Sequence, residues 1–371
     1  MTHDQVRELV RRTNPVPNPD VLETVDVPVP TFERSRDMQV DDRSHIDQRP
    51  DQRGRGPLIG IAMTAVVLLA GVIYFVTRDD DVVAPPPTTP STLDWSGATE
   101  IRTFSPDWLA ADDSFVYARL DPGRVIRIDP ATAEIVGETE VGGRLCQGLG
   151  VGFGSVWTCR GNEVVRIDPS RDEVIATIPI EKTSDQGNLA TGFGRVWVLT
   201  GIGDTLVGID PETNEPGEPI SLPVRGTDLD VDQDHIWIVS TTGNALLRVD
   251  PTTNSVDGQV DDLAQAANVD ATDVIWLTTA NGPVRIDSDT LEVDLEVDLY
   301  YGRNTDVAAS GADLFFRNQV PFLTHIDARD GSVIEEFEKP DVGSAGDVLI
   351  AFGAVWTSAY NDNALWRIPL G

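Results

Sequence analysis

The sequence predicts an all-β fold, a seven-bladed β-propeller, and three repeated features predict it. The first is a strand-forming triplet with an aromatic residue at its centre, and successive centres lie 39 to 41 residues apart. The second is a short Arg-Ile-Asp-Pro-like element that follows each triplet. The third is a period-two alternation, broken by turn residues, which indicates short antiparallel strands. Units of this length with four strands are typical of propeller blades, so we expect residues 93–371 to form one ring.

The position of the blades follows from the units themselves. The aromatic centres are Tyr117, Trp157, Trp197, Trp237, Trp276, Phe315 and Trp356. The strand before each centre is rich in small residues, which suits a strand near a crowded central axis. The seventh unit ends at Gly371 after its third strand, whereas Thr99–Phe104 precedes the first unit and alternates like a fourth strand. We therefore expect the N-terminal strand to complete the last blade, so that the ring closes.

Two segments, FGSVWTC…VVRIDPSRDEVIATIPI and FGRVWVL…LVGIDPETNE, resemble the YVTN-type propellers. This superfamily includes quinoprotein-like, NHL-type and virginiamycin B lyase-like proteins, and the resemblance covers residues 93–371. It implies the propeller fold and says little about activity, because one such fold carries many functions. In propellers of this kind, the loops that enter the first strand and those that join the second strand to the third open on one rim, the usual ligand face.

A different kind of segment precedes the repeat. Residues 57–77 are an uninterrupted apolar run without a charge, and as a helix they would span about 31 Å, the thickness of a bilayer core. Arginines flank its N-terminal side and aspartates its C-terminal side, so the positive-inside rule places the N-terminus in the cytoplasm. A cleaved signal peptide or a buried core helix would fit this pattern less well. We expect a single-pass protein of the cell membrane with an extracellular propeller.

The segments on either side of the apolar run differ from it in composition. Residues 1–56 are charged and poor in large apolar side chains, which predicts a mostly disordered cytoplasmic tail. The stretch TNPVPNPD within it resembles tails of actinobacterial single-pass membrane proteins. Residues 78–92 form a Pro/Thr linker that should extend between membrane and propeller.

Composition limits the partners. The chain has 61 acidic and 28 basic residues, a formal net charge of −33. Such a field repels phosphate backbones, so we exclude nucleic acid and expect a protein or a small molecule as ligand.

Polar residues recur where each inner strand begins, at the rim that propellers use for ligands. Five of these seven positions are Asn or Asp: Asn188, Asp228, Asn268, Asp306 and Asp347. Their oxygens can bind a cation, with calcium as the candidate cofactor, or the polar groups of a ligand. Asn and Asp also form side-chain turns to backbone N–H groups where a loop enters a strand, and both interpretations stay open.

A second rim cluster combines aromatic and basic residues, namely Tyr301, Arg303, Arg317 and Tyr360. Exposed Tyr and Arg are enriched at recognition sites, although they also occur on loops for solvation alone. The run Asp228–Asp234 is similar to a calcium loop, but His235 stands where Gly is needed and Thr241 where Glu is needed. Strand alternation that runs into a turn explains this run better.

The two cysteines, Cys146 and Cys159, are expected on the first two strands of the second unit. Pairing Gly150 with Ser155 across the turn also brings the cysteines opposite each other, which predicts a disulfide outside the cell. Two buried thiols are the alternative.

For function, the sequence favours a membrane-anchored binding or sensor module and predicts no catalytic residue. The alternative is a metal-dependent lyase resembling virginiamycin B lyase, which would need a metal held by a carboxylate and a histidine on the ligand rim. None of the four histidines (His3, His45, His235 and His325) is expected there. Whether the protein is an enzyme stays open.

Overall fold

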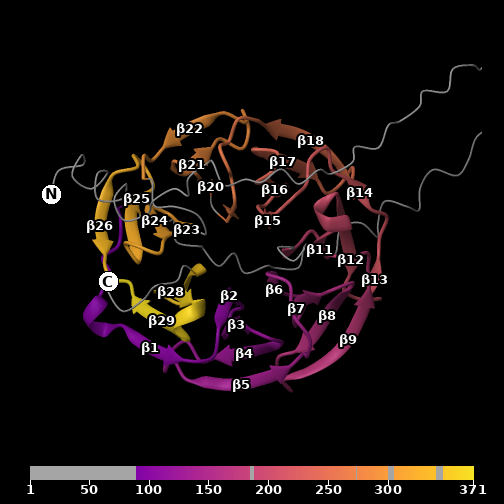
Figure 1. Cartoon of the computed structure of the whole chain (residues 1–371), viewed down its shortest axis with the longest axis horizontal. Helices are drawn as coiled ribbons and strands as arrows, with labels where there is room; N and C mark the ends of the chain where they lie inside the picture. The colour runs from indigo at the N-terminus through magenta and orange to yellow at the C-terminus, as the bar shows by residue number, and fades with distance from the viewer. Residues whose placement is uncertain (1–88, 184–187, 273, 300–304, 340–345) are drawn as a thin grey trace, which may run out of the picture. The chain divides into compact units, whose positions relative to one another are not determined.

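Seven antiparallel sheets are arranged radially around one axis in the computed structural model, which describes residues 89–183, 188–272, 274–299, 305–339 and 346–371 (Figure 1). The predicted tail, the apolar run 57–77 and most of the linker lie outside the described residues. Among the described residues, no helix has the length and apolarity that crossing a membrane requires.

Each blade is one sheet. In blades 1 to 6 the strands follow one another in chain order from the axis outward, and in blade 7 the outer strand comes from the N-terminal part of the chain. Blades 1 and 2 are β2 (Pro106–Ala111), β3 (Val116–Leu120), β4 (Arg124–Ile128) and β5 (Ile135–Glu140), then β6 (Leu149–Gly152), β7 (Ser155–Arg160), β8 (Glu163–Asp168) and β9 (Glu173–Pro179). Blades 3 and 4 are β10 (Leu189–Gly192), β11 (Arg195–Thr200), β12 (Thr205–Asp210), β13 (Glu215–Pro216) and β14 (Ile220–Ser221), then β15 (Asp228–Val231), β16 (Ile236–Ser240), β17 (Ala245–Asp250) and β18 (Ser255–Val260).

The remaining blades complete the ring. Blades 5 and 6 are β19 (Val269–Asp270), β20 (Ile275–Thr279), β21 (Gly282–Ile286) and β22 (Val293–Glu296), then β23 (Asp306–Ser310), β24 (Asp313–Arg317), β25 (Leu323–Asp327) and β26 (Val333–Phe337). Blade 7 is β27 (Val348–Ala351), β28 (Ala354–Ala359), β29 (Ala364–Pro369) and the N-terminal β1 (Thr99–Arg102). Short 3₁₀ turns lie at η2 (Trp95–Gly97), η3 (Gly201–Gly203) and η4 (Tyr360–Asp362).

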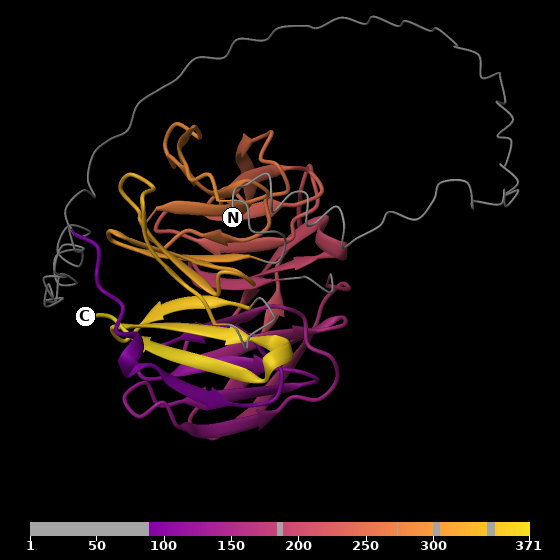
Figure 2. The same ribbon diagram turned by 60° about the vertical axis from the view of Figure 1, so that its left-hand side comes forward.

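The predicted closure is confirmed, because β1 is the outer strand of blade 7. It pairs antiparallel with β29 from Thr99 opposite Arg367 to Arg102 opposite Ala364. The strand is shorter than the predicted Thr99–Phe104. In Figure 2 the indigo N-terminal strand lies beside the yellow C-terminal strands. All seven inner strands contact the next inner strand around the axis.

The aromatic residue of each second strand fills the gap between blades. Five tryptophans at this position (Trp157, Trp197, Trp237, Trp276 and Trp356) have exposed fractions of 0 or 1%. Trp157, for example, packs against Leu189 and Val196 of blade 3, and its indole N–H donates to the Gly152 carbonyl at 3.0 Å. Burial of one such side chain contributes about 3 kcal/mol, so the repeated tryptophan is the main apolar contact between blades.

Blade 3 departs from the four-strand pattern, because its outer strand is split into β13 and β14. Pro216 and Pro219 lack the backbone N–H that a continuous ladder needs. Gly217 between them still donates to the Gly208 carbonyl at 2.9 Å.

The predicted disulfide between Cys146 and Cys159 is present, with a Cα–Cα distance of 5.3 Å. One detail of the prediction is wrong: Cys146 lies three residues before β6 rather than on it. The backbone N–H of Cys146 nevertheless donates to the Cys159 carbonyl at 2.7 Å, which continues the pairing beyond the strand end.

Removal of residues 1–105 should abolish cooperative unfolding, whereas removal of residues 1–88 should leave it intact. The longer deletion removes β1 and with it Ile101, which packs in the core between blades 7 and 1. Circular dichroism melting of both proteins tests this, and a cooperative transition in the shorter protein would contradict closure by β1.

Reduction of the Cys146–Cys159 bridge should lower the free energy of unfolding by about 3 kcal/mol, the chain-entropy value for a loop of this size. Urea unfolding with and without reductant measures the difference. The double variant Cys146→Ser with Cys159→Ser is the control and should not respond to reductant.

Candidate axial site

A cavity of about 330 Å³ lies on the propeller axis and is lined by the inner strands of all seven blades. This volume is at the lower end of the range found for small-molecule sites. Five carboxylates line it (Asp228, Asp230, Asp270, Asp306 and Asp347), together with Asn188, the indole of Trp108 and aliphatic side chains. None of the described residues that line the cavity is basic. The cavity therefore offers hydrogen-bond acceptors and negative charge beside an apolar wall.

The carboxylates join neighbouring blades. Each accepts a hydrogen bond from a backbone N–H in the next blade, about forty residues later or across the ring closure. The pairs are Asp228 with Val269 (2.9 Å), Asp230 with Ala271 (2.8 Å), Asp270 with Ala309 (2.6 Å), Asp306 with Val348 (2.9 Å) and Asp347 with Leu109. These bonds hold the inner strands side by side where no ladder links them.

The two predicted amides extend the same scheme. Asn188 donates from its side chain to the carboxylate of Asp228, and Asn268 donates to the Thr305 carbonyl of the next blade at 2.6 Å. The local turn also occurs, since the Asn188 side chain accepts from the Leu189 N–H at 2.8 Å. The structure thus places four of the five predicted rim residues (Asn188, Asp228, Asp306 and Asp347) at the cavity, and Asn268 is not among its lining residues. The hydrogen bonds of all five residues cross between blades, which neither sequence interpretation included.

Burial perturbs these carboxyl groups strongly. It raises the pKa of Asp228 to about 7 against the hydrogen bonds from Val269 and Asn188, which lower it. Burial, with the charge of Asp270, raises the pKa of Asp230 to about 7, and burial raises the pKa of Asp270 to about 6. The pKa of Asp347 lies well above its usual range because of burial and the adjacent Asp306. Burial is the largest cause of each of these shifts.

Arg317, predicted on the rim, is fully buried between blades 6 and 7. Its Nε donates to Thr357 Oγ1 at 2.8 Å, and its terminal nitrogens donate to the carbonyls of Phe322 at 3.0 Å and Ser358 at 2.9 Å. Burial lowers the pKa of this guanidinium to about 9. Arg317 holds two blades together and does not face solvent.

Tyr360, the next member of the predicted rim cluster, links blade 7 to blade 1. Its hydroxyl donates to the carboxylate of Asp121 in blade 1, which also accepts from Arg119 at 2.7 Å. Arg119 is almost fully buried and donates further to Asp107 at 2.7 Å. The other two predicted members of this cluster, Tyr301 and Arg303, lie outside the described residues.

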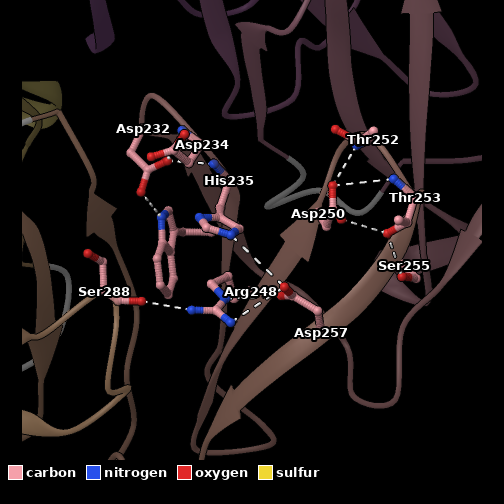
Figure 3. A network of polar contacts seen from close by, with 11 residues as sticks. Asp232, Asp234, His235, Arg248, Asp250, Thr252, Thr253, Ser255, Asp257 and Ser288 are labelled. Carbon is pink, nitrogen blue, oxygen red and sulfur yellow. Dashed lines mark hydrogen bonds and ion pairs between the residues drawn. The ribbon is translucent and has the colours of Figure 1, made fainter.

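The histidines lie away from the cavity. His235 lies in the turn before β16, on the opposite rim, and its Nε2 is 4.0 Å from Asp257, which accepts from Arg248 at 3.0 Å (Figure 3). His325 is buried in β25 and contacts Asp313 at 2.8 Å. Within the described part of the chain, no three His, Cys, Asp or Glu residues are placed to hold a metal ion together.

The run Asp228–Asp234 divides between two roles. Asp228 and Asp230 line the cavity from β15, whereas Asp232 accepts the backbone N–H groups of Asp234 and His235 in the following turn. Its other oxygen accepts from the indole N–H of Trp237 at 2.7 Å.

Sequence reasoning missed three cavity residues, Trp108, Asp230 and Asp270. The signal for the two aspartates was present, because residues two apart on a strand share a face, and each follows a predicted rim residue by two. Trp108 occupies the corresponding rim position of blade 1, but the prediction selected only polar residues at this position.

No protein-family model matches the sequence, and no curated protein matches it. Solved structures are similar. The β-propeller domain of Myceliophteria thermophila Cps50 (Swd1) matches with 12% identity and a TM-score of 0.61, over 73% of this chain and 98% of that one. Kuenenia stuttgartiensis hydrazine synthase matches with 12% identity and a TM-score of 0.54, over 74% and 97%. The computationally designed Ika8 protein matches with 12% identity and a TM-score of 0.55, over 72% and 83%. At such identity the similarity shows the propeller fold alone.

Arg317→Lys should lower the free energy of unfolding by about 3 kcal/mol, because one ammonium cannot replace a planar group that donates to acceptors in both blades. Urea unfolding measures the loss. Arg225→Lys is the matched control, since its guanidinium is 58% exposed, and it should change little. Equal effects of the two substitutions would contradict the interblade role of Arg317.

Proposed function

We propose that the protein is a binding module whose axial cavity takes a small organic cation. The observation that carries this proposal is the lining of the cavity: five carboxylates, one indole and no basic side chain among the described lining residues. Such a lining favours an ammonium group near the carboxylates and an apolar body against the aliphatic wall. The propeller itself is consistent with a binding or scaffold module.

Trp108 supports an organic cation over a bare ion. An indole face attracts ammonium groups and contributes about 0.5–2 kcal/mol to their binding. The indole nitrogen is buried and finds no hydrogen-bond acceptor among the described residues.

Anchoring remains part of the proposal. The apolar run 57–77 and the linker 78–92 would hold the cavity outside the cell at the membrane surface. A YVTN-type module of this kind would sense or capture ligands there. Calcium, which the sequence suggested, is a second probe of the same cavity.

Isothermal titration calorimetry of the full chain with ethanolamine, tetramethylammonium and calcium tests this proposal. We expect the organic cations to bind and Trp108→Leu to weaken their binding about tenfold, the effect of losing about 1.4 kcal/mol. Asp289→Asn removes an exposed carboxylate and should leave binding unchanged. Binding of calcium alone would favour a metal-binding cavity, and binding of no cation would overturn the proposal.

A further inference from the structure

The carboxyl groups that line the axial cavity also form the contacts between inner strands, so their ionisation should affect the stability of the ring. We propose that the cavity is a proton-operated lock: protonated carboxyls keep the inner strands together, and their loss of protons places mutually repelling charges around the axis and loosens the ring. This inference concerns the fold itself and applies to the protein without a bound cation.

The geometry lets a protonated carboxyl serve both purposes. Its carbonyl oxygen still accepts the backbone N–H of the next blade, as Asp270 does from Ala309 at 2.6 Å. Its hydroxyl can donate to a neighbouring carboxylate, and the adjacent Asp306 helps to raise the pKa of Asp347. When Asp347 loses its proton, its negative charge lies beside the carboxyl group of Asp306.

The positive charge near the cavity is too small to compensate. Arg317 attracts Asp306, Asp347 and Asp362, but its own donors are directed to oxygens of blades 6 and 7. Arg317 therefore acts on these carboxyl groups by charge alone, from its position between blades 6 and 7.

One further acidic residue and one neutral amide lie near the cavity. Asp107 of β2 lies near Asp306, and burial raises its pKa although Arg119 is bonded to it. Asn188 of blade 3 is neutral and donates to Asp228. The inner strand of blade 2, β6, presents Leu149, Gly150 and Val151 to the cavity and no charged group.

The sign of the pH effect follows from the raised pKa values. Asp228 has a pKa of about 7 in the folded protein and 3.8 as the unperturbed value. The unfolded chain then releases its proton first, so the folded state loses stability as pH rises from about 4 to about 7. For one such group, the unfolding equilibrium constant should rise on the order of a hundredfold between pH 5 and pH 8.

Urea unfolding of the full chain in detergent at pH 5, 6, 7 and 8 tests the lock. The wild type should lose stability across this range. In Asp228→Asn and in Asp270→Asn, the rise of the unfolding equilibrium constant between pH 5 and pH 8 should be at least tenfold smaller than in the wild type. Asn keeps an oxygen acceptor for the backbone N–H but cannot ionise. Asp289→Asn is the matched control and should retain the wild-type slope, and all three variants keep His235 and His325, so these histidines do not distinguish the variants.

Hydrogen exchange of the wild type covers the case in which the variants do not fold. After correction for the intrinsic pH dependence, peptides that contain the N–H groups of Val269, Ala309 and Val348 should exchange faster at pH 8 than at pH 5. Peptides of the outer ladder β8–β9 should not change. A wild type whose stability and inner-strand exchange are the same at pH 5 and pH 8 would overturn the proposal, as would equal slopes for Asp228→Asn and Asp289→Asn.

Discussion

The structure depends on one hydrogen bond that recurs in blades 4 to 7, in which a backbone N–H of the following blade donates to an inner-strand carboxylate. Each blade satisfies its own backbone by its ladder, so adjacent blades have no ladder between them and meet through side chains alone. The buried second-strand aromatics, five of which are tryptophans, fill the gaps outside the inner strands, where apolar packing is possible. Near the axis, aspartates of blades 4 to 7 make the contact instead.

The same choice of residue creates the candidate site. A strand that uses Asp to reach its neighbour brings a carboxylate to the axis, and blades 4 to 7 do so together. Burial of these groups costs free energy unless they are protonated or paired with a cation. In our proposals, the contacts between inner strands, cation binding and proton binding all involve these five carboxylates.

The repeat made the ring predictable, because the aromatic centres and the Thr99–Arg102 strand report local periodicity directly. The disulfide was predictable for the same reason, since its cysteines are opposite in one hairpin. The partners of Asp228 and Asp347 were not, because each lies a whole blade away. Arg317 shows the limit most clearly: its residue type suggests an exposed recognition group, whereas its surroundings make it an internal link between blades.

Infrared spectroscopy of the carboxyl C=O stretch tests the central claim most directly, because only protonated carboxyl groups give this band. At pH 6 ordinary surface aspartates are ionised, so a band that persists there reports buried, protonated groups. We expect the band at pH 6, its disappearance as the pH rises above about 7, and a weaker band in Asp228→Asn than in Asp289→Asn. Complete ionisation of the folded wild type by pH 5 would contradict the account.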